Sequence, residues 1–219
     1  MKKEKERCVL FLYFVIEEML LGGLVLPLLK ERISIEGFHA FSLLAHLFLL
    51  VIVLLICFPF AVKQADRFRE KTCINVLKSL FAAGLILAVQ VLIVSFLRHA
   101  EITSANQQAL AQMRNESILR YVSESLIYAP LMEELVFRHC LTERLNDHCC
   151  RGISVMISCV LFALMHVGAA LFAGRLIELY YLPVYALCAL ILYLLKNNTG
   201  SLLSSVLAHM CVNLAVLVL

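Results

Sequence analysis

Two neighbouring glutamates inside an apolar stretch are the first residues whose chemistry stands out in this sequence. The stretch reads Ala-Pro-Leu-Met-Glu-Glu-Leu-Val-Phe-Arg and ends at Arg138. Successive residues of a helix point about 100° apart, so Glu133 and Glu134 cannot aim at one spot. Glu134 and Arg138 lie four residues apart on a shared face and can form an ion pair, which leaves Glu133 free to act as a base. A plain ion pair at the membrane interface is the alternative for this cluster.

Two further polar pairs follow in later apolar stretches. Phe162 precedes His166 by four residues, so an aromatic ring and an imidazole share a helix face. His209 and Asn213 repeat the spacing and place an imidazole beside an amide. A charge near the bilayer centre costs about 2.5–3.5 kcal/mol on insertion scales, so such residues are candidates for function. Each pair taken alone is explained as well by hydrogen bonds that hold neighbouring helices together.

Taken together, the three motifs resemble those of the CAAX-protease and bacteriocin-processing intramembrane proteases (CPBP, or Abi). The pattern of that family is Glu-Glu-x-x-x-Arg, then Phe-x-x-x-His, then His-x-x-x-Asn on successive helices, and this sequence contains all three in that order. The Thr-Gly-Ser stretch that ends at Ser201 also resembles the family. The resemblance extends from about Glu124 onward, whereas the earlier part is similar only as generic membrane helices.

The resemblance implies a peptidase active site. It implies that Glu133 and His166 activate a water molecule, and that His209 and Asn213 stabilise the oxyanion. General chemistry agrees with this division, because amide hydrolysis needs a base and hydrogen-bond donors for the developing alkoxide. The residues expected to support the site are Glu134, Arg138 and Phe162.

A bound metal is the alternative to a metal-free mechanism. The family has also been described as metalloproteases, and two histidines with a glutamate can bind zinc. The sequence lacks the His-Glu-x-x-His arrangement of the familiar zinc proteases. We therefore expect a glutamate mechanism without a cofactor, with zinc as the open alternative.

The elements that carry these residues are expected to be membrane helices. The 219 residues are 62% hydrophobic and 16% charged, and the mean hydropathy is +0.90. A soluble domain carries about 25% charged residues, and here the apolar residues form long blocks. The lipid bilayer is therefore the expected solvent, with no separate soluble domain. The net charge of +3 gives no reason to expect a nucleic-acid partner.

Seven segments are apolar over about the 20 residues that a spanning helix needs. They are Val9–Leu29, Phe38–Val62, Cys73–Leu97, Ile118–Leu141, Ile153–Ala173, Leu176–Leu195 and Ser201–Leu219. The predicted fold class is thus all-α, a polytopic bundle of about seven spanning helices. Six or eight spans remain open, because the fourth segment is the least apolar and the fifth and sixth are closely linked. We expect residues 1–117 to hold three spans and an external loop, and residues 118–219 to form the catalytic core.

Basic residues indicate the orientation in the membrane. They concentrate at the segment ends on the side of the N-terminus, which the positive-inside rule places in the cytoplasm. The first apolar run is too long for a signal peptide and has no small-residue cleavage site, so we expect it to be retained. The chain is short and its features look prokaryotic, which suggests the bacterial cytoplasmic membrane. The external loop from His99 to Glu116 is expected to form a short helix or a mobile cover.

Depth in the bilayer gives an internal check on the site. Counted at about 1.5 Å per residue from the cytoplasmic segment ends, Glu133 and His209 lie roughly 12 Å deep. His166 lies roughly 20 Å deep by the same count, so it fits less well unless its helix starts late or tilts.

Other polar residues also occur inside the predicted spans. Glu17 and Glu18 form an acidic pair in the first segment, but no arginine follows four residues later. Lining a water cavity and guiding a substrate are open alternatives for this pair, and a structural pairing with Lys78 or Gln90 of the third segment is the favoured interpretation. His46 is expected to make a contact between helices rather than to bind a ligand.

The function expected from these features is that of an intramembrane endopeptidase acting on membrane-associated or secreted peptides. The main alternative is a non-enzymatic membrane scaffold or a bacteriocin self-immunity protein. An ion-coupled transporter that uses Glu17, Glu18 and Glu133 ranks last, because such folds show repeated halves and none is visible here.

Overall fold

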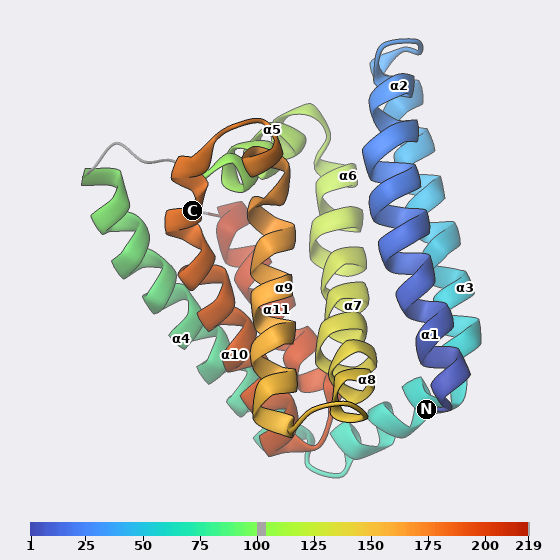
Figure 1. Ribbon diagram of the computed structural model, residues 1–219, viewed down its shortest axis with the longest axis vertical. Coiled ribbons are helices and arrows are strands. Elements are labelled where there is room, and N and C mark those ends of the chain that lie inside the picture. Colours follow the sequence, from blue (N-terminus) through green and yellow to red (C-terminus); the bar gives the residue numbers. More distant parts are fainter. Residues whose placement is uncertain (100–103, 219) are drawn as a thin grey trace.

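The chain folds into a bundle of helices. The computed structural model describes residues 1–99 and 104–218, with the side chains of residues 1–95 and 104–215. Within these residues every regular element is a helix and there is no strand, so the predicted all-α class is confirmed. The helices α1–α3 stand at one edge of the bundle and α4 at the opposite edge, while α5 crosses one end (Figure 1).

Three stretches of the described chain have π-helical turns, labelled η1–η3, and η4 is a 3₁₀ helix. In order, the elements are α1 (Lys3–Phe11), η1 (Leu12–Val25), α2 (Leu26–Lys30), α3 (Ile35–Arg69), α4 (Thr72–His99), α5 (Ala105–Glu116), α6 (Ile118–Tyr121), η2 (Val122–Tyr128), α7 (Ala129–Glu133), η3 (Glu134–Leu141), α8 (Thr142–Asn146), α9 (Arg151–Phe172), η4 (Leu176–Tyr181), α10 (Leu182–Thr199) and α11 (Leu202–Val218). The run from α1 to α2 forms one long helix, and so does the run from α6 to α8.

Five of the described helices are long and apolar enough to cross a membrane. They are Lys3–Lys30, Ile35–Arg69, Thr72–Ser95, Arg151–Phe172 and Leu176–Thr199, and Leu202–Ala215 is a shorter apolar helix. The fourth predicted segment is helical too, although the ionisable residues of α6–η3 make it less apolar. Each predicted segment therefore forms a helix in the described residues, and only Leu219 lies outside them. The protein is an integral membrane protein.

Serine caps and one glycine separate the helices. The hydroxyl of Ser34 accepts a hydrogen bond from the backbone of Gly37 at the start of α3, and the hydroxyl of Ser117 accepts one from Arg120 at the start of α6. Such caps satisfy amides that have no partner within the helix. Gly200 ends α10 with a φ of 70°, a left-handed conformation that favours glycine.

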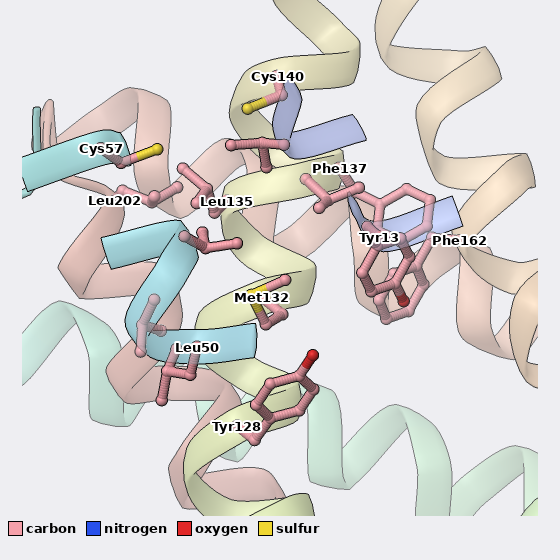
Figure 2. Packing of buried hydrophobic residues seen from close by; sticks show 14 of the residues in the cluster. Tyr13, Leu50, Cys57, Tyr128, Met132, Leu135, Phe137, Cys140, Phe162 and Leu202 are labelled. Carbon is pink, nitrogen blue, oxygen red and sulfur yellow. The ribbon is translucent and has the colours of Figure 1, made fainter. Parts of the chain in front are cut away.

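The long helix α6–α8 lies between the two parts of the bundle. On one side, α1–α3 pack on it through a cluster of buried apolar residues (Figure 2). In that cluster the rings of Tyr13 and Phe162 each meet Phe137 edge to face, with centroids 5.8 and 5.4 Å away. On the other side, α4 and α9–α11 form a second cluster around Ile86 and Val167. The helix that carries the first motif is thereby fixed from both sides.

Candidate active site

The ion pair predicted for the first motif is present and fully buried. The Nε of Arg138 lies 3.3 Å from Oε2 of Glu134, and both side chains are almost wholly excluded from the surface. The guanidinium carbon of Arg138 also lies 4.2 Å from the centre of the Phe162 ring. A buried carboxylate needs such a cation, because its desolvation is costly. Glu134, Arg138 and Phe162 thus form a compact support between η3 and α9.

The π-helical turns of η3 tie this support to α9. The backbone carbonyl of Phe137 accepts hydrogen bonds from the hydroxyls of Thr142, at 2.7 Å, and Ser158, at 2.6 Å. π-Helical turns often occur at functional sites, where they change the direction of nearby side chains. The hydroxyl of Ser158 belongs to α9, so the backbone of the first motif is held directly against the helix that carries the second.

His209 lies between the two glutamates. Its Nδ1 donates a hydrogen bond to Oε1 of Glu134 over 3.1 Å, and its Nε2 lies 3.9 Å from Oε2 of Glu133. The bond to Glu134 fixes the orientation of the ring, so that Nε2 is the nitrogen left for other partners. The third motif therefore meets the first one directly.

His166 is held by its own helix and by two aromatic rings. Its Nδ1 donates to the carbonyl of Phe162 over 2.9 Å, which leaves Nε2 as an acceptor in the neutral ring. The imidazole lies between the rings of Phe162 and Tyr185, with centroids 4.4 and 4.6 Å away. Tyr185 belongs to α10 and was not singled out in the sequence.

Asn213 is anchored on the far side of the site. One N–H of its side-chain amide donates to the carbonyl of Ser125 over 2.8 Å, and its backbone carbonyl accepts from the hydroxyl of Tyr121 over 3.1 Å. Both partners belong to the α6–η2 part of the long helix. The side-chain amide has a second N–H, which neither of these bonds uses.

These side chains line one cavity of about 150 Å³. The sequence-predicted residues along its wall are Glu133, Phe162, His166, His209 and Asn213. Within the described residues, Oε2 of Glu133 is buried and accepts no hydrogen bond, and Glu133 makes no direct ion pair with His166. A cavity of this size has room for several water molecules, and the polar side chains along its wall can bind them. The structure therefore brings the three motifs together around a space where water can meet a carboxylate oxygen that accepts no hydrogen bond.

The comparison with known families agrees with this arrangement. Residues 116–215 match the family described as type II CAAX prenyl endopeptidase Rce1-like. This part of the chain is similar to the Rce1-like family. The match includes all seven motif residues, and it confirms the family that the motifs indicate. No curated protein and no solved structure matches the chain. At the level of the family, this match supports a CAAX-type intramembrane endopeptidase.

Helix lengths in the Rce1-like domain account for the depth mismatch expected from the sequence. The helix of Glu133 continues to Asn146, beyond the predicted end at Leu141, which places Glu133 about 20 Å from its end and near the level of His166. The α10–α11 turn is buried, since the hydroxyl of Ser201 donates to the carbonyl of Gln64 over 2.9 Å. The short α11 thus starts inside the bundle, and no late start of α9 is needed.

The predicted external helix covers the cavity of the Rce1-like domain. It forms α5, and the part of the predicted loop at residues 100–103 lies outside the described residues. Three residues of α5, namely Asn106, Gln107 and Leu110, line the cavity. The α5 start is fixed, because the amide of Ala105 donates to Oε1 of Glu178 over 2.8 Å. The side-chain amide of Asn106 donates to the hydroxyl of Tyr185 over 3.2 Å, so the ring beside His166 also holds the cover.

A second buried polar network lies outside the cavity. Arg120 pairs with Glu124 at 3.0 Å, and Glu124 also accepts from the hydroxyl of Ser42 at 2.7 Å. His46 lies 3.5 Å from Glu124 and meets the ring of Tyr128 with centroids 4.8 Å apart. The contact of His46 between helices is as predicted. Sequence reasoning missed the network, although Arg120 and Glu124 have the same spacing of four as the first motif.

The partner predicted for the acidic pair of the first helix is wrong. Glu17 accepts a hydrogen bond from the hydroxyl of Tyr128 over 2.6 Å. Lys78 instead donates to the side chain of Asn198 over 2.6 Å, and Gln90 lines the cavity beside Glu133. The physical reason is the order of the helices, because η1 packs beside α6–α8 while α4 lies at the opposite edge of the bundle (Figure 1).

The donor set also bears on the zinc alternative. Among the described residues, no three His, Cys, Asp or Glu side chains converge as a metal site requires. His209 gives one nitrogen to Glu134, and His166 gives one to a backbone carbonyl. Both bonds use Nδ1 and leave Nε2 of each ring available, as in zinc-binding histidines, so the zinc alternative stays untested.

Proposed function

We propose that this protein is an intramembrane endopeptidase in which Glu133 activates water for attack on a peptide bond. The observation that carries the proposal is the buried Oε2 of Glu133, which has no hydrogen-bond partner among the described residues and borders a cavity inside an apolar bundle. A carboxylate in the membrane is costly, so one that accepts no hydrogen bond and borders a cavity is a strong candidate for chemistry. Its neighbour Glu134, by contrast, is neutralised by Arg138.

In the proposed mechanism, water binds between Glu133 and Nε2 of His166. Glu133 takes the proton as the water oxygen attacks the carbonyl carbon, and His166 orients the water by accepting its second hydrogen bond. The proton then passes from Glu133 to the leaving amine as the C–N bond breaks. General acid–base catalysis of this kind contributes about 100- to 10,000-fold.

The oxyanion is stabilised by the side chains of the third motif. The free N–H of Asn213 is a donor for the developing alkoxide, and Nε2 of His209 donates when its ring is protonated. Glu134 stabilises that protonated ring through its bond to Nδ1. Arg138 balances the charge of Glu134. Glu134 can therefore orient His209 without adding a second unpaired carboxylate to the site.

The proposed substrate is a membrane-associated or secreted peptide, or a membrane protein. The cavity lies inside the bundle beneath α5 and is bordered by apolar residues of α4 and α10. An extended segment is the form that such an enclosed site accepts, because a helix satisfies its own backbone groups and hides its carbonyl carbons.

The test is cleavage of a membrane-associated peptide by purified protein in liposomes. Glu133→Gln should lower the rate about 100- to 10,000-fold, because the amide keeps the shape of the side chain but cannot take a proton. Glu17→Gln is the matched control, since it changes a membrane glutamate that does not line the cavity. Equal rates in the two variants would end the assignment of Glu133. If Glu133→Gln retained a biological phenotype while cleavage was absent, the scaffold or immunity alternative would be favoured.

A further inference from the structure

A second cleft lies at the end of the bundle that is opposite to α5, where α1 begins (Figure 1). It has a volume of about 370 Å³ and runs between the first turn of α1 and the C-terminal part of α3. The lining combines apolar side chains with three lysines. The apolar residues are Met1, Ile56, Cys57, Pro59 and Phe60, and the basic residues are Lys2, Lys5 and Lys63.

The cleft exists because α1 rests on α3 at a proline. Pro59 lies inside α3 and has no N–H to complete the helical hydrogen bonds of that turn. The Nζ of Lys5 donates to the backbone carbonyl of Ile56 over 2.7 Å, within the same turn. The thiol of Cys57 donates to the sulfur of Met1 over 3.3 Å. These two contacts fix the start of the chain above α3, with the cleft beside them.

Phe60, which forms one wall of the cleft, is held in place by His139 of the neighbouring helix. The ring of Phe60 stacks on His139 with centroids 4.2 Å apart and an angle of 16° between the planes. The Nε2 of His139 lies 3.9 Å from Oε1 of Glu6, so the buried carboxylate of α1 faces the histidine. Among the described residues no acidic side chain lines the cleft, and its three lysines therefore make it uniformly positive.

The cleft also opens toward the surface that faces lipid. Leu55 and Phe58 flank it on α3 and are 70% and 62% exposed, as side chains in contact with acyl chains are. Lysines at the end of a membrane helix extend their charges to the interface, where phospholipid headgroups lie. Basic pockets between membrane helices bind anionic lipid headgroups, and each nearby lysine adds attraction.

From these observations we infer that the cleft binds one anionic phospholipid. The phosphate lies against Lys2 and Lys63, with a further N–H of Lys5, whose ammonium has three donors and gives one to Ile56. One acyl chain enters the apolar part along Ile56 and Phe60 and continues over the outer face of α3. The site shares no lining residue with the catalytic cavity.

The charge of the cleft favours this occupant over a neutral one. Three lysines without an acidic neighbour in the lining would repel one another in an apolar cleft unless an anion lay between them. A phospholipid supplies the anion and the apolar chain in one molecule at the depth where the cleft lies.

The experiment is native mass spectrometry of the protein taken from vesicles with equal amounts of phosphatidylglycerol and phosphatidylcholine. The unmodified protein should retain one phosphatidylglycerol in preference to phosphatidylcholine. The double variant Lys2→Gln, Lys63→Gln should weaken this retention roughly 25-fold, at roughly fivefold for each lysine. The control is Lys71→Gln, an exposed lysine at the same end that does not line the cleft, and it should retain the lipid.

Three results would overturn the inference. The first is equal retention of the two lipids by the unmodified protein. The second is an equal loss in the double variant and in Lys71→Gln, which would indicate attraction by the whole basic surface. The third is a second copy of this chain in place of the lipid. Circular dichroism of each variant verifies that the helices are intact, so that a loss of lipid is read from folded protein.

Discussion

Two buried polar clusters, each with a histidine and a glutamate, lie in the same bundle and differ in how their groups are satisfied. In the cluster around Glu124, the carboxylate has Arg120 and Ser42 as direct partners, and the next carboxylate, Glu17, has Tyr128. In the catalytic cavity, Oε2 of Glu133 accepts no hydrogen bond within the described residues. Ionisable residues in a membrane helix are thus of two kinds, those that hold helices together and those left open for chemistry.

The largest expected difference in activity is between variants of His166 and His46. His166→Ala should lower kcat/KM about 100- to 10,000-fold, because the proposed water loses one of its two partners. His46→Ala should leave kcat/KM within several-fold, since His46 contacts Glu124 and Tyr128 rather than the cavity. Cleavage of a membrane peptide by both purified variants measures this. Similar losses would show that the two clusters are not functionally distinct.

The arginines of the two clusters should contribute differently to the stability of the fold. Arg138→Met leaves Glu134 as a fully buried carboxylate without its cation, which should destabilise the fold by about 3–5 kcal/mol. Arg120→Met should cost less, because Glu124 keeps its bonds to Ser42 and its contact with His46. Unfolding in detergent micelles, followed by circular dichroism, gives both values. A larger loss for Arg120→Met would reverse the comparison.

The hydrogen bond between Tyr185 and α5 predicts a smaller effect on kcat/KM. Tyr185→Phe keeps the ring beside His166 but removes the hydroxyl that binds Asn106. The hydroxyl also bonds to Ser104, and each hydrogen bond is worth about 1 kcal/mol, so kcat/KM should fall roughly 5- to 25-fold. Tyr185→Ala should lose more, because the stacking on His166 is removed as well. Steady-state cleavage by the two variants distinguishes the ring from the hydroxyl, and equal losses would assign the whole effect to the hydroxyl.

Removal of metal should have no effect. Cleavage after dialysis against a strong chelator should be unchanged, because the cavity lacks three converging donors in the described residues. Loss of activity on chelation, followed by recovery on addition of zinc, would replace the glutamate mechanism with a metal mechanism.

The sequence predicted contacts within a helix better than contacts between helices. The pair Glu134–Arg138 follows from a spacing of four, and the structure shows it. The bond from His209 to Glu134 and the stacking of Tyr185 on His166 join separate helices, so no local pattern encodes them. Apolar runs locate the helices but do not give their neighbours.

The same limit explains why the partner of Glu17 and the depth of His209 were predicted wrongly. Glu17 was expected beside the third segment, but its helix packs on the one that carries Tyr128. The depth of His209 could not be judged from hydropathy, because the turn at Ser201 is buried against Gln64 rather than at the membrane surface. Both errors concern how helices are arranged in space, which depends on side chains far apart in the sequence.

The central claim is that the motifs of α7 and α11 meet around one cavity within the membrane. Glu133→Cys together with His209→Cys, in a chain whose native cysteines are replaced by alanine, tests it with a short thiol cross-linker in intact membranes. The side chains at these positions approach within 3.9 Å, so the cross-link should form readily. Glu133→Cys with Leu55→Cys is the control, because Leu55 faces outward on α3. Cross-linking of the control pair, or none between positions 133 and 209, would contradict the proposed site.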